Sequence, residues 1–93
     1  MSTEQAVIQV IAEVKHIDPD NIALSDKLSE LQFDHAGRRD LANEINEFFQ
    51  HRLNMVFDTL MHPSETDADQ TVGEVIQKVK AKHPRPRTPI EVS

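Results

Sequence analysis

The chain has no cysteine, tryptophan or tyrosine and only two glycines among its 93 residues. Without cysteine it can form no disulfide and offers no thiolate to a metal ion. Its longest uninterrupted apolar run is three residues, so no stretch is long enough to form a transmembrane helix. The first residues show no basic region followed by an apolar run. We therefore expect no signal peptide and a cytoplasmic protein.

The apolar residues recur at helical spacing, and glycine and aromatic residues are scarce. This pattern predicts an all-α fold within a single domain. We expect a first helix over about residues 2–16, a middle helix from about residue 34 on, and a last helix over about 71–82. The first and last helices begin with capping-box patterns, Ser2 with Gln5 and Thr71 with Glu74. Asp34 is the expected N-cap of the middle helix.

Charge is distributed unevenly along the chain. Residues 1–77 contain five Lys/Arg and fifteen Asp/Glu, a net of −10, and residues 78–93 contain five Lys/Arg and one acid, a net of +4. The acidic body disfavours nucleic acid as a partner, because phosphate neutralisation needs a basic face. It favours a partner protein with a basic surface. We divide the chain into a helical domain, 1–82, and a flexible Pro/Arg tail, 83–93.

Residues 17–33 form a long connection between the first two helices. Its apolar residues are irregularly spaced among turn-forming residues. A loop of this length in a small domain is normally functional or held in place. We interpret the apolar residues as pins that insert into the core; they are Ile17, Ile22, Leu24, Leu28, Leu31 and Phe33.

Four segments occur in the same order as in acyl carrier proteins, the small acidic bundles that carry acyl groups on a phosphopantetheine arm. They are the first helix with residues 17–22 after it, the approach to the second helix at 26–34, the spacing Leu41, Ile45, Phe49 and Leu53, and Thr71-Val72. Over about residues 5–80 the chain resembles this family. The resemblance implies a four-helix bundle with a long first loop and an extended link after the second helix.

The resemblance does not extend to the attachment site. The family's motif is Asp-Ser-Leu at the start of the second helix, and this chain has Asp34-His35-Ala36 there. The serine hydroxyl attacks the phosphate of the cofactor, whereas an imidazole at His35 would form only a labile phosphoramidate. We therefore expect no phosphopantetheine arm, no other cofactor and no catalytic residues.

The docking face of the family matches in part. Arg38 and Arg39 follow Gly37 and place two cations in the first turn, opposing the helix dipole by about 0.3–1 kcal/mol each. The residues expected to contact a partner are Asp34, Arg38, Arg39, Asp40, Glu44 and Glu47. The resemblance implies a monomeric, non-catalytic docking module for an enzyme of acyl, polyketide or peptide-synthetase metabolism.

Other functions stay open. One is a working carrier with its phosphopantetheine on a serine elsewhere, or with the serine replaced in this sequence. Another is a non-covalent binder of an acyl chain within the bundle. An enzyme or an unrelated helical adaptor is a third. We expect no metal site, because none of the five histidines pair at i, i+3 or i, i+4.

The course of the chain after the second helix has two interpretations. Apolar periodicity alone predicts one continuous helix as far as Met61. The family pattern predicts a helix end near Gln50 and a short third helix within residues 54–61. We favour the family pattern, because Leu53-Asn54 falls at its break.

Overall fold

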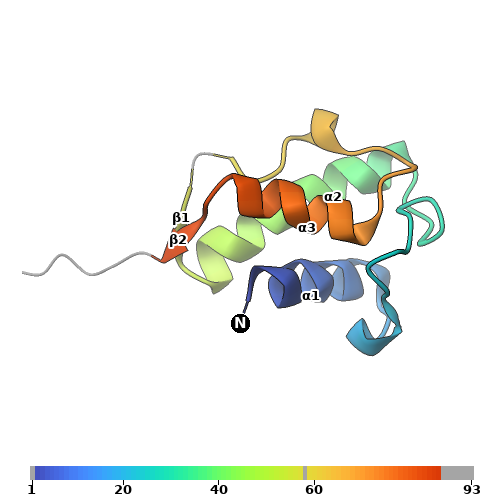
Figure 1. Cartoon of the computed structure of the whole chain (residues 1–93), viewed down its shortest axis with the longest axis horizontal. Helices are drawn as coiled ribbons and strands as arrows, with labels where there is room; N and C mark the ends of the chain where they lie inside the picture. The colour runs from blue at the N-terminus through green and yellow to red at the C-terminus, as the bar shows by residue number, and fades with distance from the viewer. Residues whose placement is uncertain (1, 58, 87–93) are drawn as a thin grey trace, which may run out of the picture.

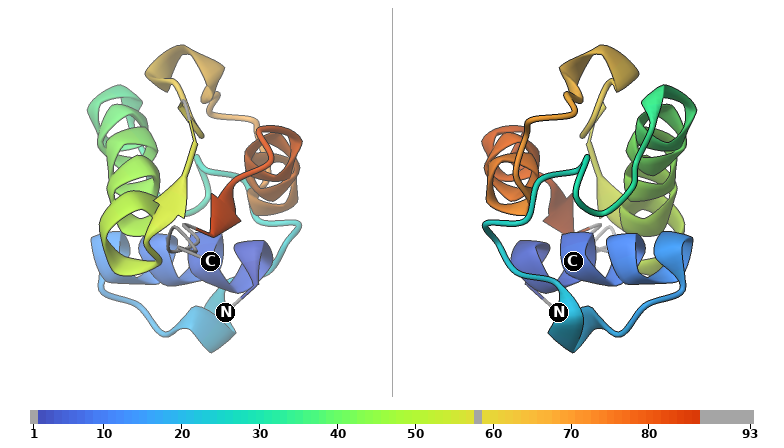
Figure 2. Two further views of the ribbon diagram at one scale, coloured as in Figure 1. Left: turned by 90° about the vertical axis from the view of Figure 1, so that its left-hand side faces the viewer. Right: turned by 90° about the vertical axis from the view of Figure 1, so that its right-hand side faces the viewer.

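Three α-helices form the body of the protein (Figure 1). The computed structural model describes residues 2–57 and 59–86. The helices are α1 (Thr3–Lys15), α2 (His35–Glu47) and α3 (Val72–Ala81). α1 packs against both α2 and α3, and the views from the two sides show it crossing beneath them (Figure 2). None of the helices in the described residues has the length and apolar character needed to cross a bilayer.

Both predicted capping boxes are present. The backbone N–H of Gln5 donates to Oγ of Ser2 at 3.1 Å, and the side chain of Gln5 accepts from the Ser2 N–H at 3.0 Å. Thr71 and Glu74 repeat the arrangement at the start of α3. α1 ends at His16, whose φ of 56° turns the chain out of the helix. The predicted bounds of α1 and α3 are therefore confirmed to within about a residue.

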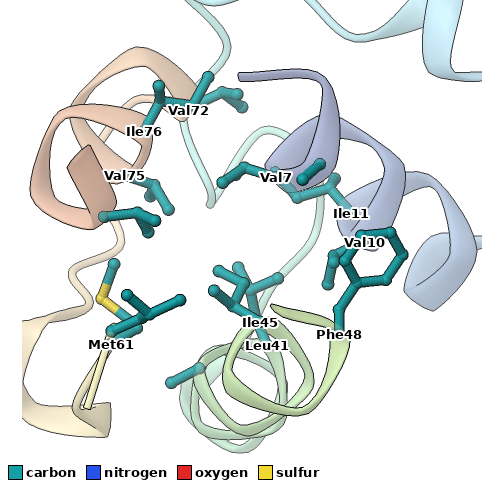
Figure 3. Packing of buried hydrophobic residues seen from close by; sticks show 14 of the residues in the cluster. Val7, Val10, Ile11, Leu41, Ile45, Phe48, Met61, Val72, Val75 and Ile76 are labelled. Atoms are coloured by element: carbon teal, nitrogen blue, oxygen red, sulfur yellow. The ribbon is translucent and has the colours of Figure 1, made fainter. Parts of the chain in front are cut away.

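All three helices contribute apolar side chains to one core (Figure 3). Val7 and Ile11 of α1, Leu41 and Ile45 of α2 and Val75 of α3 are buried there. Their recurrence at three- and four-residue spacing explains why these segments are helical, since each helix buries one stripe. The predicted helical core is confirmed.

The loop before α2 is held in place by part of the expected set. Ile22, Leu28 and Phe33 are buried in the core, and Leu31 is partly buried against it. The prediction is wrong for Ile17 and Leu24, which are exposed. The loop, which contains the short 3₁₀ helix η1 (Pro19–Asn21), also bonds to the segment before α3. The N–H of Leu28 donates to the carbonyl of Gln70 at 2.9 Å, and that of Val72 donates to Asp26 at 2.9 Å. The loop therefore links α2 to α3 by backbone hydrogen bonds as well as by apolar contacts.

The four-helix expectation is wrong for the described residues, which contain three α-helices. α2 continues as a widened π-helical segment, η2 (Phe48–Arg52), and Asn54 stops it with a φ of 52°. Among the residues described here, 54–57 and 59–61, neither the continuous helix to Met61 nor a separate third helix is found. Phe48 and Phe49, at the start of η2, are both buried.

Extended chain occupies part of the region where a third helix was expected. β1 (Met55–Val56) pairs antiparallel with β2 (Arg85–Pro86). The 3₁₀ helix η3 (Pro63–Glu65) follows and lies against α2. The expected tail, 83–93, is thus paired at Arg85–Pro86, and its residues 87–93 lie outside the described part of the chain.

Asn46 holds the chain before η3 at Leu60 and Met61, which are both buried. Its Oδ1 accepts hydrogen bonds from the N–H groups of Leu60 and Met61, at 2.8 Å and 3.2 Å. Its Nδ2 donates to the carbonyls of Ala42 and Met61, at 2.9 Å and 2.8 Å. One side chain therefore satisfies backbone groups that a third helix would otherwise have bonded internally.

Candidate functional site: two hollows beside helix α2

The start of α2 is built around Asp34. Its Oδ1 accepts a hydrogen bond from the N–H of Gly37 at 2.6 Å, which confirms Asp34 as the N-cap. A Cβ at position 37 would lie 3.0 Å from that oxygen, so glycine permits the close approach. His35 is the first helical residue and is exposed.

Arg38 is turned toward the body of the protein. Its Nη1 donates to the carbonyl of Phe33 at 3.1 Å. Its Nε is buried and has no hydrogen-bond partner among the described residues. Arg38 therefore holds the chain in place at the start of α2, and its side chain is only partly accessible to solvent.

One hollow, which we call the acidic groove, lies between the C-terminal half of α1 and α2. It has a volume of about 620 Å³. Its lining residues are Glu13, Val14, His16, Asp40, Asn43, Glu44 and Glu47. Asp40, Glu44 and Glu47 follow the spacing i, i+4, i+7, which places them on one face of α2.

The four carboxylates of the acidic groove differ in their pairing. Nη1 of Arg52 lies 2.6 Å and 2.7 Å from the two carboxylate oxygens of Glu13. The hydrogen bonds from Arg52 and then Gln9 lower the pKa of Glu13 from its ordinary value of 4.5. The three carboxylates of α2 make no ion pair with any described residue. They therefore project uncompensated negative charge from the groove.

A second hollow, which we call the His35 pocket, lies between the first turns of α2 and the η3 region. It has a volume of about 520 Å³. Its lining residues are His35, Arg39, His62, Pro63, Ser64 and Thr66. No carboxylate lines this pocket, in contrast to the acidic groove.

The six residues expected to contact a partner therefore separate. Asp40, Glu44 and Glu47 come together in the acidic groove. Arg39 lies with His35 in the other pocket. Asp34 and Arg38 line neither hollow and instead organise the start of α2.

Sequence reasoning missed the residues that complete each hollow. Glu13 and His16 belong to the acidic groove, and His62 and Ser64 belong to the His35 pocket. Glu13 could have been found, because it lies off the apolar stripe of α1 near the helix end that meets α2. No sequence signal placed residues 62–66 beside α2, since this contact depends on the path taken after Arg52.

Histidine, aspartate and glutamate residues occur throughout the described part of the chain. This part contains no group of three or more His, Asp or Glu residues arranged to hold a metal ion. A small pocket between Val10, Val14 and Phe48 has a volume of about 60 Å³. It lies at the contact of α1 with α2, beside the Glu13–Arg52 ion pair.

Comparisons of the chain with protein-family models, with curated proteins and with solved structures each found no match.

Proposed function

We propose that this protein is a non-catalytic docking module of acyl-carrier type that lacks a phosphopantetheine arm. It docks through the acidic groove onto the basic surface of an enzyme of acyl, polyketide or peptide-synthetase metabolism. The observation that carries the proposal is the row of unpaired carboxylates on α2, Asp40, Glu44 and Glu47.

The charge pattern supports a basic partner. Unpaired, exposed carboxylates on one helix face attract a complementary surface and speed its association. Glu13 adds a fourth carboxylate from α1, and its pairing with Arg52 fixes one wall of the groove. A partner need not break that ion pair to reach the α2 acids.

The relation to carrier proteins is supported by the order of elements before α2. A capped first helix, a long core-bound loop and a second helix capped by Asp34 follow the family pattern. The chain departs from the pattern after Arg52, where β1 replaces the expected third helix. We therefore propose a likeness to the docking helix of the family, and not to its whole bundle.

The absence of the arm has a direct test. The chain is incubated with coenzyme A and a broad-specificity phosphopantetheinyl transferase, and its intact mass is measured. We expect no pantetheine-sized increment on the natural sequence. An increment would overturn this part of the proposal, and a gain by His35→Ser alone would support the carrier ancestry.

Docking is tested with the same purified transferase, as a defined enzyme that binds carrier domains. Its affinity for the ¹⁵N-labelled chain is measured together with the amide shifts that it causes. We expect shifts along the acidic groove and weaker binding by Glu44→Lys/Glu47→Lys. The control Asp20→Lys/Asp69→Lys makes the same charge change at exposed acids outside the groove. An equal loss of affinity in both variants would mean that the net charge of the chain, and not the acidic groove, determines binding.

One observation favours the alternative of a working carrier. Ser64 lines the same pocket as His35, so a serine hydroxyl lies near the family's attachment position although it is distant in sequence. If the transferase does modify the natural chain, Ser64→Ala should abolish the increment. An increment retained by Ser64→Ala would exclude this residue.

A further inference from the structure

The His35 pocket differs in charge from the rest of the molecule. The chain has a net charge of −6, yet the side chains lining this pocket comprise an arginine, two histidines, two hydroxyls and a proline. Four acids are direct sequence neighbours of pocket residues, and none of them lines the pocket; they are Asp34, Asp40, Glu65 and Asp67. Glu65 lies between Ser64 and Thr66, and its carboxylate is already engaged. It accepts from the N–H of His62 at 3.0 Å and from Nζ of Lys82 at 3.2 Å. No carboxylate therefore competes for the donors in the pocket.

His62 is oriented so that one ring nitrogen is available. Its Nδ1 accepts the backbone N–H of Ser64 at 3.3 Å and lies 2.8 Å from Oγ of Ser64. A backbone N–H can only donate, so Nδ1 is an acceptor and the ring proton is on Nε2. Nε2 makes no hydrogen bond within residues 2–57 and 59–86, and it is a donor for a ligand.

Arg39 supplies the permanent charge. It is exposed on the first turns of α2 and makes no ion pair or hydrogen bond with any described residue. A guanidinium is planar and presents paired N–H donors that match two oxygens of a phosphoryl group. Arg38 beside it bonds to the Phe33 carbonyl, so of these two arginines only Arg39 faces the pocket.

We propose that the His35 pocket binds the phosphoryl group of a phosphate monoester, with Arg39 as the charged anchor and His35 and His62 as further hydrogen-bonding groups. The volume of about 520 Å³ exceeds what a phosphoryl group alone needs and lies in the range of small-molecule pockets. Pro63 provides an apolar wall for the organic part of the ligand. The inference is independent of docking through the acidic groove, which lies elsewhere on α2.

The test is a titration of the ¹⁵N-labelled full chain with phenyl phosphate, and separately with inorganic phosphate, at constant ionic strength set with sodium chloride. We expect saturable shifts confined to the amides of residues 35–39, 62 and 64–66. Phenyl phosphate should bind more tightly than inorganic phosphate, because only the monoester carries an organic group. Equal affinities for the two ligands would assign the site to free phosphate and would overturn the proposal that the ligand is a monoester.

Variants separate a built site from general attraction. Arg39→Gln should weaken phenyl phosphate binding at least about fivefold, and Arg39→Lys should restore part of the loss by keeping the charge. The matched control is Lys80→Gln, which removes one exposed charge from α3, outside the pocket. Its affinity should equal that of the natural chain. Shifts that do not saturate in the millimolar range, or equal losses in Arg39→Gln and Lys80→Gln, would overturn the proposal.

Discussion

Nη1 of Arg52 lies 2.6 Å from Oε1 of Glu13, and this ion pair joins the end of the π-helical segment to α1. The guanidinium also lies 4.5 Å from the ring centre of Phe48, which holds it over the edge of the core. The pair thus ties the two walls of the acidic groove together at one end. It leaves the three acids of α2 without a counter-charge.

This relationship predicts a pH-dependent stability. The pKa of Glu13 is lowered in the folded protein, chiefly by the hydrogen bond from Arg52, and that of Glu65 is lowered chiefly by the backbone N–H of His62. A lowered carboxyl pKa contributes stability above its unfolded value of 4.5, and that contribution disappears as the pH falls through the lower folded value.

The measurement is urea unfolding of the natural chain and Glu13→Gln between pH 6 and pH 3. The pair is largely exposed, so we expect a loss of at most about 1 kcal/mol at pH 6. The difference between the two proteins should shrink toward pH 3. A difference that is constant over this range would show that packing, rather than charge, is responsible.

Asn46→Ala should be among the more damaging single substitutions. It removes the partners of the N–H groups of Leu60 and Met61 and of the Met61 carbonyl, next to buried side chains. Leaving such groups unsatisfied should cost about 2–4 kcal/mol in the free energy of unfolding. Asn43→Ala on the exposed face of α2 is the control and should stay within about 0.5 kcal/mol. Similar losses in both would contradict this role.

The cap of α2 gives a smaller and separable effect. Asp34→Ala removes the acceptor of the Gly37 N–H and should destabilise the protein by about 0.5–2 kcal/mol. Asp34→Asn keeps an acceptor oxygen and should lose only the charge interaction with the helix dipole. Thermal unfolding followed by circular dichroism distinguishes them. Equal melting temperatures for the two variants would mean that the cap oxygen is not what matters.

The strand pair predicts an effect of shortening the chain. Removing residues 84–93 deletes β2 and leaves β1 without its partner. Hydrogen exchange at the amides of residues 55–57 should accelerate, whereas that of α1 and α3 should be unchanged. Uniform acceleration throughout the chain would instead indicate that the segment supports the whole fold.

Much of the fold was predictable because its signals are local. The Ser2–Gln5 and Thr71–Glu74 capping boxes and the Asp34 cap each involve residues three positions apart. The path after Arg52 was not predictable in this way. It depends on burial of both Phe48 and Phe49, on Asn46 reaching Leu60 and Met61, and on a strand partner about thirty residues away.

The same distinction between local signals and long-range contacts applies to the two hollows. Asp40, Glu44 and Glu47 lie on one helix, so helical spacing was enough to group them. The addition of His62 and Ser64 to His35 required a tertiary contact between η3 and α2. Helical spacing could not supply it, and the family resemblance suggested a helix within 54–61 instead.

The left-handed turn at His16 has a consequence for protein engineering. His16, Gln32, Asn54 and His83 all have positive φ, whereas neither glycine does. Backbone of this kind disfavours residues with a Cβ, by roughly 1–2 kcal/mol in a left-handed helix. Glycine at position 16 would relieve that strain at the end of α1 and also remove the imidazole from the rim of the acidic groove. A glycine variant that is more stable but binds its partner differently would show that the imidazole at position 16 is retained at the expense of stability.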